Sequence, residues 1–317
     1  MDRPAPNKGW GLVQRILLSG APPFVTATSW VVANGQTGKV YFGKEEKELR
    51  EVASLTKIMT LFVAIKLMKR FNINPYTSVV PISEYAASMT GTSALLESGD
   101  KLFLGDLLHG MMLPSGNDAA LALSEYFGKL LRSTVLPPID LDPKEQQEYI
   151  NRLSPRKLFI KEMNRITQEL KMNDTVFANP HGLMNFNNHS SAQDIAKLAS
   201  VAMKEPYFFE IVNCKKHSCK GLDEKENEKL FSWRNTNKLL WKGFNGIKTG
   251  ITPTAGPCLA TSIEREGISL IVVVLNCKTL NQRWVEVKKL SKWAFSRLKK
   301  LNRLEDKEKV LQMIVHV

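Results

Sequence analysis

Strand-forming segments stand near both ends of this 317-residue sequence, and helix-forming segments fill the region between them. Residues 29–42 contain two β-rich segments separated by a glycine-containing turn, which predicts a hairpin. Near the other end, the apolar segments 258–263 and 268–277 flank a charged turn and predict two antiparallel strands. Strands this far apart in the chain bury their apolar faces most simply by sharing one sheet.

The middle of the chain has the periodicity of helices. Apolar residues recur at helical spacing after Ser54, so this residue is expected near a helix N-terminus. Further helices are predicted at 104–113, 119–131, 157–172, 191–203 and 284–301. We therefore predict an α/β fold of the α+β type, in which an antiparallel sheet formed by N- and C-terminal strands is flanked by helices and carries an inserted all-helical lobe.

The same patterns predict how the chain is divided. The predicted parts are an irregular N-terminal arm at 1–25, a single domain at 26–300 and a charged tail at 301–317. Within the domain, residues 26–60 and 245–300 are expected to form the sheet lobe and residues 61–244 the helical lobe, with an insertion at 134–155. A cleft between two lobes is a common place for a binding site.

The sequence carries a formal net charge of +13. Its basic residues are spread through glutamate-containing stretches such as 44–50 and 215–229, without interleaved aromatic residues, so nucleic-acid binding is not expected. The longest uninterrupted apolar run, 270–275, is far too short to span a membrane, so no integral membrane segment is expected. We recognise no export signal, and the cellular location stays open.

The chain contains four cysteines, Cys214, Cys219, Cys258 and Cys277, which are too few for a disulfide scaffold. Cys258 and Cys277 fall in apolar strand-like segments and are expected to pack as small hydrophobic groups. Cys214 and Cys219, with His217 between them, have side chains that bind metals. Their spacing fits no common zinc pattern and no second ligand pair follows them, so a metal site is not the favoured interpretation.

Ser54 and Lys57 lie three residues apart at the start of a predicted helix. Residues at this spacing share a helix face, so the amine can reach the hydroxyl. A serine becomes a strong nucleophile when a base takes its proton, and a lysine acts as that base when burial or a nearby cation lowers its pKa. The same pattern recurs at Ser154 and Lys157, within the insertion, where we interpret it as chance.

Two further short motifs follow along the chain. Ser115 and Asn117 lie in a turn between two predicted helices, where they can face a cleft or cap a helix. Lys248, Thr249 and Gly250 end a predicted strand and offer a positive charge, a hydroxyl and room for a ligand to approach the backbone. The ordered set Ser-x-x-Lys, Ser-x-Asn, Lys-Thr-Gly is far more specific than any one of its parts.

With these motifs the chain closely resembles the low-molecular-mass penicillin-binding proteins, the serine-type D-alanyl-D-alanine carboxypeptidases, over roughly residues 26 to 298. The resemblance extends to segments 37–38, 99–100, 163–164, 175–183, 190–194 and 235–237. It implies a penicillin-binding/β-lactamase-like fold, with one catalytic transpeptidase-like domain at 26–300.

The resemblance implies a role for each catalytic residue. Ser54 is the expected nucleophile and Lys57 the base that takes its proton. Ser115 is expected to relay that proton to the departing amine, and Asn117 to hydrogen-bond Lys57. The positive charge of Lys248 is expected to help keep Lys57 neutral.

The resemblance also implies a substrate-binding set. Lys248, Thr249 and Arg283 are expected to hold the free carboxylate of the substrate, and a bidentate arginine suits such a group. A surface charge before a helix is the other interpretation of Arg283. Backbone N–H groups of Ser54 and Ile251 are the expected oxyanion hole.

Two other residues that match the family, His181 and Asp194, are interpreted as structural. We expect His181 to order a loop and Asp194 to cap a helix. The family uses no metal or organic cofactor, and none is expected here.

The implied reaction has two steps. Ser54 attacks the carbonyl of the penultimate D-alanine, the terminal D-alanine leaves, and water hydrolyses the acyl-enzyme. The expected partners are therefore peptides or peptidoglycan that end in D-alanyl-D-alanine, with β-lactams as inhibitors that acylate Ser54.

Two other functions stay open at this point. A serine β-lactamase needs an efficient deacylating base, and residues 169–173 match the Glu-x-x-x-Asn string of one class, although relatives have an ordinary helix end there. A catalytically idle cell-wall-binding protein is the second, but such a protein has no need for both Ser54 and Lys57. Covalent labelling by a penicillin distinguishes these functions.

Overall fold

The computed structural model describes residues 20–315, with side chains as far as residue 301 and for Arg303. Residues 20–25 contain no helix or strand, in agreement with the expected irregular arm. The rest of that arm, residues 1–19, lies outside the described residues.

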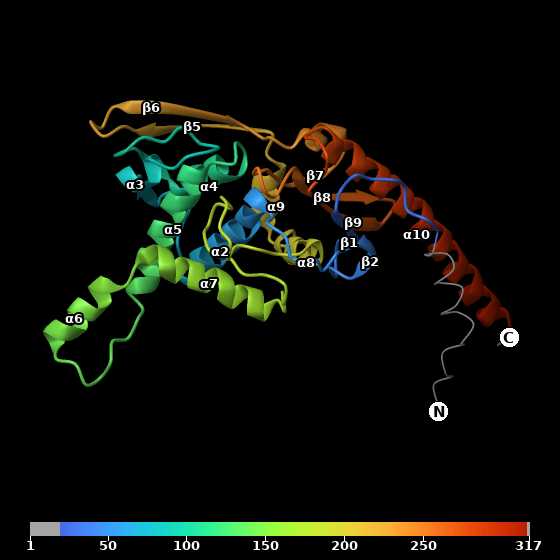
Figure 1. Cartoon of the computed structure of the whole chain (residues 1–317), viewed down its shortest axis with the longest axis horizontal. Helices are drawn as coiled ribbons and strands as arrows, with labels where there is room; N and C mark the ends of the chain where they lie inside the picture. The colour runs from blue at the N-terminus through green and yellow to red at the C-terminus, as the bar shows by residue number, and fades with distance from the viewer. Residues whose placement is uncertain (1–19, 316–317) are drawn as a thin grey trace.

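A five-stranded antiparallel sheet is built from both ends of the chain, in the order β2-β1-β9-β8-β7 (Figure 1). Its strands are β1 (Ser29–Asn34), β2 (Val40–Lys44), β7 (Asn245–Gly250), β8 (Cys258–Arg265) and β9 (Ile268–Leu275). β1 pairs with β9 along its whole length, from Ser29 opposite Leu275 to Asn34 opposite Leu270. The predicted sharing of one sheet by N- and C-terminal strands is therefore confirmed.

Both faces of this sheet are buried because its central strand is apolar at almost every position. The odd-numbered residues 271–275 of β9 pack into one core with α2 (Thr56–Arg70) and α8 (Ala192–Ala202). The even-numbered residues 270–274 pack into a second core with α10 (Gln282–Val315). A strand buried on both faces has a nearly continuous apolar sequence, which is why this strand was predictable.

Three of the remaining helices, α4 (Leu104–Met112), α5 (Asn117–Arg132) and α7 (Pro155–Glu169), lie within a few residues of their predicted positions. Three others, α3 (Glu84–Ala87), α6 (Pro143–Arg152) and α9 (Pro206–Asn213), were not predicted, and short 3-10 turns lie at Ala53–Leu55 and Lys238–Lys242. Ser154 caps α7 by accepting a hydrogen bond from the Lys157 N–H. This second Ser-x-x-Lys copy therefore has a structural role.

The prediction of an all-helical lobe at 61–244 was wrong in one respect, because four strands pair within it. They form a second sheet in the order β3-β4-β5-β6, from Val79–Pro81, Lys101–Phe103, Lys216–Leu222 and Glu228–Arg234. The first two strands are too short to give a pattern. The last two carry several charged residues, mostly lysine, and only Phe231 and Trp233 are buried on them.

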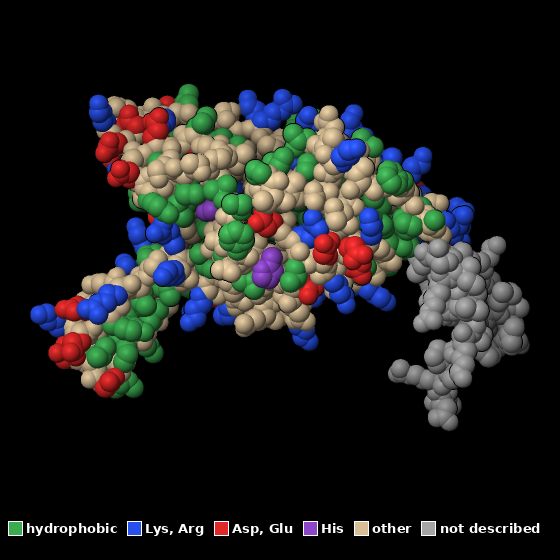
Figure 2. Space-filling model, in the orientation of Figure 1, with side chains coloured by type: hydrophobic (Ala, Val, Ile, Leu, Met, Phe, Trp, Pro, Cys, Tyr) green, Lys and Arg blue, Asp and Glu red, His purple; other side chains and the backbone are tan. Residues whose placement is uncertain are grey.

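The predicted insertion at 134–155 projects from the body of the protein and carries α6 (Figure 1). A capping box between Asp142 and Glu145 begins this helix, none of whose residues is buried. Apolar side chains gather on this projecting insertion (Figure 2). They include Leu136 and Ile139, which are 88% and 98% exposed.

The expected charged tail at 301–317 is not a separate segment, because α10 continues to Val315. The sequence after residue 300 contains no proline or glycine to end the helix.

Within the described residues no helix is long and apolar enough to cross a bilayer. On the face seen in Figure 2, Lys and Arg side chains are scattered rather than gathered in one block.

Gly128 sets the close approach of α5 to the start of α7. A Cβ atom at this position would lie 2.0 Å from the backbone oxygen of Pro155. We predict that Gly128→Ala lowers stability by about 1–3 kcal/mol, although alanine is the better helix former by roughly 1 kcal/mol. Thermal unfolding tests this, with the exposed neighbour Lys129→Ala as control; equal melting temperatures for the two variants would contradict it.

Candidate active site

Ser54 lies in the 3-10 turn that leads into α2. The residue before it, Ala53, has a φ of 48°, a left-handed conformation that is uncommon for a residue with a side chain. From Thr56 to Ile65 every residue of α2 is buried, so the helix that follows the serine is anchored in the core. The serine is therefore held by a rigid element on one side and a tight turn on the other.

The Lys57 amine contacts three oxygen atoms. It lies 3.2 Å from Ser54 Oγ, 2.7 Å from Asn117 Oδ1 and 2.7 Å from the His181 carbonyl oxygen. The last two atoms can only accept hydrogen bonds, whereas a hydroxyl can also donate. A neutral amine has two N–H donors and one lone pair, so the two acceptors take the donors and the lone pair is left for the Ser54 hydroxyl.

The environment of Lys57 favours this neutral form. Its side chain is fully buried, and burial followed by the charge of Lys248 lowers the pKa of Lys57 well below its ordinary value. The carboxylate of Asp118 opposes this shift as a smaller effect. Asp118 instead accepts hydrogen bonds from Ser93 Oγ and the Ala94 N–H, which hold the 93–96 loop.

Ser115 lies between α4 and α5, and Asn117 is the first residue of α5 and contacts Lys57. Asn117 donates from Nδ2 to the Thr90 carbonyl oxygen, which turns its Oδ1 toward Lys57. Ser115 has a φ of 70°, and its backbone oxygen accepts a hydrogen bond from Thr92 Oγ1. Its own hydroxyl is buried and has no hydrogen-bond partner among the described residues, so it is available to a ligand.

Lys248 and Thr249 come from β7 on the sheet side of the pocket. Lys248 is 1% exposed, and burial followed by the charge of Arg283 lowers its pKa to about 7. The Thr249 hydroxyl lies 2.9 Å from the hydroxyl of Thr236. No carboxylate in the described part of the chain pairs with Lys248, and a buried ammonium group without such a partner attracts an anion.

The end of β7 passes directly beside the serine. A Cβ atom at Gly250 would lie 2.9 Å from the Val52 oxygen and 3.1 Å from the Ser54 nitrogen, so only glycine fits. The next residue, Ile251, lines the pocket with a side chain that is 47% exposed.

Arg283, near the start of α10, also lines this pocket. It is 9% exposed and donates to the backbone oxygens of Gly250 and Cys258, while its Nε has no partner among the described residues. The interpretation of Arg283 as a surface charge is therefore wrong.

Most of these residues line a cavity of about 420 Å³, whereas Lys57 and Lys248 are buried behind it and are not among its described lining residues. The cavity is lined by Ser54, Ser115, Asn117, Thr249, Ile251 and Arg283, with backbone and side chains from the 91–92, 182–183 and 252–253 segments. No aspartate or glutamate is among the described lining residues. Arg283, which lines the cavity, and the buried Lys248 near it give the site a positive character that suits a carboxylate.

His181 and Asp194 lie outside the reacting groups. His181 Nδ1 accepts a hydrogen bond from the Leu183 N–H, and burial followed by the charge of Lys57 lowers the pKa of His181 to about 3. Asp194 does not cap α8 as expected, because Ser191 does so by accepting from the Asp194 N–H. The Asp194 carboxylate accepts instead from Thr175 Oγ1 and the Asp174 N–H.

Some contacts in the site were not predicted from the sequence. Thr92 and Thr236 support Ser115 and Thr249 through single hydroxyl contacts. The His181 carbonyl oxygen is a backbone acceptor that any residue type offers. Thr236 and His181 lie in segments that match the family, but no local feature of the sequence indicates these particular contacts.

The model of the D-alanyl-D-alanine carboxypeptidase family matches residues 18–129 and 154–279. The chain is a member of this family. The matched ranges contain every residue discussed for the site except Arg283, and the gap between them corresponds to the projecting arm that carries α6.

Curated members of the D-alanyl-D-alanine carboxypeptidase family are similar over most of the chain. The carboxypeptidase DacF of Bacillus subtilis strain 168 is 31% identical over 272 residues, which are 85% of this chain and 62% of that protein. DacD of Escherichia coli K12 is 29% identical over 290 residues, 88% of this chain and 66% of the relative. The chain thus spans slightly less than two thirds of the length of these two relatives.

Two solved structures confirm the predicted fold class. The Streptomyces K15 DD-transpeptidase superposes with a TM-score of 0.74 at 29% identity, covering 87% of this chain and all of that one. Penicillin-binding protein 5 from Haemophilus influenzae gives a TM-score of 0.71 at 28% identity, covering 88% and 73%.

The buried Lys248 predicts a specific pH dependence of stability. Its pKa is about 7 in the fold against an ordinary value of 10.5, so the unfolded chain binds more protons between these values. Native stability therefore rises with pH across this window, by at most about 1.4 kcal/mol per pH unit for this group. We expect Lys248→Met to flatten the rise in thermal unfolding experiments, with the exposed Lys47→Met as control. An unchanged slope in Lys248→Met would refute the assignment.

Proposed function

We propose that the protein is a serine-type D-alanyl-D-alanine carboxypeptidase that acts on peptidoglycan-type peptides through an acyl-enzyme on Ser54. The observation that carries this proposal is the environment of Lys57. Its amine is fully buried and 3.2 Å from Ser54 Oγ, with two pure acceptors that take its N–H groups. Such an amine is a general base directed at one hydroxyl.

In the first step the Ser54 oxygen attacks the carbonyl carbon of the penultimate D-alanine, and its proton passes to Lys57. The N–H groups of Ser54 and Ile251 stabilise the oxyanion that forms. The short distance from the Gly250 position to the Ser54 nitrogen supports this pairing of backbone groups.

The tetrahedral intermediate then collapses and the terminal D-alanine leaves. Its amine nitrogen needs a proton, which passes from Lys57 through the Ser115 hydroxyl. The hydroxyl of Ser115 is buried at the pocket and without another partner among the described residues, which supports this role. Water hydrolyses the ester on Ser54 in the second step.

The terminal carboxylate of the substrate is recognised by Lys248, Thr249 and Arg283. Lys248 and Arg283 are largely buried, and no acidic side chain among the described lining residues competes for them. A bound carboxylate would satisfy both cations, so substrates that end in a free carboxylate are preferred.

The two alternatives have less support. Glu169, the residue suggested for β-lactamase deacylation, forms ion pairs with Arg165 and Lys66 and does not line the pocket. An idle binding protein would gain nothing from a buried, destabilising lysine beside a serine, since burial of an ammonium group costs free energy.

We predict that a fluorescent penicillin labels the protein covalently and that Ser54→Ala abolishes the label. The chain offers a matched control, because Ser154 stands in a second Ser-x-x-Lys sequence but caps α7. Ser154→Ala should keep full labelling while losing about 1 kcal/mol of stability. Intact mass measured over time reports both the adduct and its lifetime.

The lifetime of the adduct separates the candidate functions. A long-lived adduct, followed by D-alanine release from a pentapeptide, supports the carboxypeptidase. Rapid loss of the adduct with consumption of penicillin indicates a β-lactamase. A folded protein that forms no adduct refutes the catalytic proposal.

We also predict a bell-shaped pH dependence of kcat/KM on a peptide ending in D-alanyl-D-alanine. Activity rises with pH as Lys57 loses its proton and falls as Lys248, whose pKa is about 7, loses the charge that binds the carboxylate. Lys248→Arg should remove the alkaline fall, because arginine stays charged. An identical alkaline limb in this variant would exclude Lys248 as its source.

A further inference from the structure

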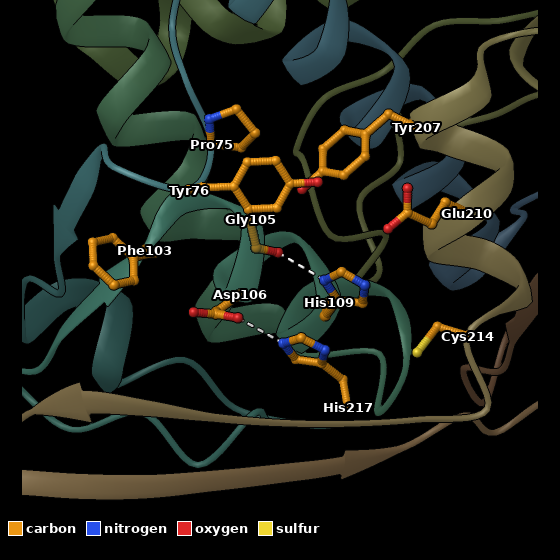
Figure 3. A pocket seen from close by; sticks show the side chains of 10 residues that line it. All are labelled: Pro75, Tyr76, Phe103, Gly105, Asp106, His109, Tyr207, Glu210, Cys214 and His217. Carbon is orange, nitrogen blue, oxygen red and sulfur yellow. Dashed lines mark hydrogen bonds and ion pairs between the residues drawn. The ribbon is translucent and has the colours of Figure 1, made fainter.

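A second cavity, of about 260 Å³, lies between α4, α9 and β5 (Figure 3). It shares no described lining residue with the Ser54 pocket. Its wall contains His109 from α4, His217 from β5, and Cys214 from the junction between α9 and β5. These three side-chain types are the ones that bind zinc-class metals in proteins.

The three side chains converge on one point. One ligand atom from each of His109, Cys214 and His217 lies within 4.8 Å of the others. The Cys214 thiol is free, and its sulfur lies 3.2 Å from the Lys216 carbonyl oxygen. His109 is 7% exposed, whereas Cys214 and His217 are partly exposed, so the group is open to solvent from one side.

Each histidine is oriented by its other ring nitrogen. His109 Nδ1 lies 2.8 Å from the Gly105 carbonyl oxygen, to which it donates. His217 Nε2 lies 2.6 Å from Asp106 Oδ1. Metal-binding histidines usually have such a carbonyl or carboxylate partner, which fixes the tautomer and leaves the opposite nitrogen free to coordinate.

Figure 3 shows the free ring nitrogens on the side of the cavity where Cys214 and Glu210 lie. From this arrangement we propose that His109 Nε2, His217 Nδ1 and Cys214 Sγ bind one zinc-class divalent cation, with a water molecule as the fourth ligand. The Cys214 thiolate and the nearby Glu210 carboxylate together balance the charge of the cation. Binding releases the thiol proton to solvent.

The cation requires a small rearrangement of the histidines. The two imidazole rings are stacked, with centroids 4.0 Å apart and planes 11° from parallel. The lone pairs of the free ring nitrogens lie in these planes, so they do not point at a common position. The rings must tilt toward each other for both lone pairs to meet one ion. His217, whose side chain is 24% exposed, has room for this movement.

Such a cation would join α4, β5 and the end of α9, adding to the hydrogen bond between His217 and Asp106 that already links β5 to α4. His109 lies on α4, which leads through Leu113 to Ser115 in the catalytic pocket. The Leu113 carbonyl oxygen accepts a hydrogen bond from the Thr236 N–H, at the end of β6. A metal ion that links α4 to β5 therefore stabilises the end of α4 and the turn that carries Ser115 into the Ser54 pocket.

The test uses untagged, chelator-treated full-length protein titrated with Co²⁺. We expect one Co²⁺ per chain, a thiolate-to-cobalt charge-transfer band, tetrahedral d–d bands, and displacement by Zn²⁺. Cys214→Ser should remove the charge-transfer band and weaken Zn²⁺ binding by more than about 100-fold, beyond the 10–100-fold typical of an outer-shell change. Asp106→Ala, which removes only the partner of His217, should fall within that range.

Cys219→Ser is the matched control, because Cys219 lies near Asp106 and His217 in an overlapping group but is not a proposed ligand. It should keep the band and the affinity. A second measurement on the wild-type protein needs no variant: Zn²⁺ should protect Cys214, and not Cys219, from alkylation mapped by mass spectrometry. Absence of a thiolate band, its persistence in Cys214→Ser, its loss in Cys219→Ser, or equal alkylation of the two cysteines overturns the proposal.

Discussion

The structure depends above all on accommodating two buried lysine side chains that have no carboxylate partner among the described residues. Lys57 and Lys248 are 0% and 1% exposed, and each has a lowered pKa whose largest cause is burial. Burial of an ammonium group costs free energy, so the surrounding fold has to supply the stability that these groups remove. The almost fully buried α2 and the two-sided core around β9 are where it does so.

The chain order explains how the two lysines come together. Lys57 follows the N-terminal hairpin and Lys248 precedes the C-terminal one, and they meet because β1 and β9 pair in one sheet. That pairing brings β7 against the turn that holds Ser54, where a Cβ at Gly250 would touch the serine backbone. Under the proposed mechanism this strand pairing is therefore needed for catalysis as well as for stability, because without it Lys57 and Ser54 would be separated from Lys248.

The sequence predicted those parts of the molecule that have a local residue pattern, such as an apolar strand or an amphipathic helix, or a set of motifs in a fixed order. The apolar strands at 258–277, the helix after Ser54 and the three motifs are of this kind. The second sheet was missed because β5 and β6 carry many charged residues and bury few. The third contact of Lys57, the His181 carbonyl oxygen, is a backbone atom 124 residues away and leaves no mark in any side-chain pattern.

The proposed metal-binding group of His109, Cys214 and His217 is a second case in which residues distant in the sequence meet only in the folded chain. Cys214, His217 and Cys219 were set aside as metal ligands because no second ligand pair follows them in the sequence. In the proposed site the third ligand, His109, precedes Cys214 and His217 by about a hundred residues, on α4, where it shares a helix face with Asp106, the partner of His217. A spacing rule finds sites whose ligands come from one hairpin or one helix. It does not find a site assembled when a strand packs against a distant helix, since the tertiary fold alone supplies that pairing.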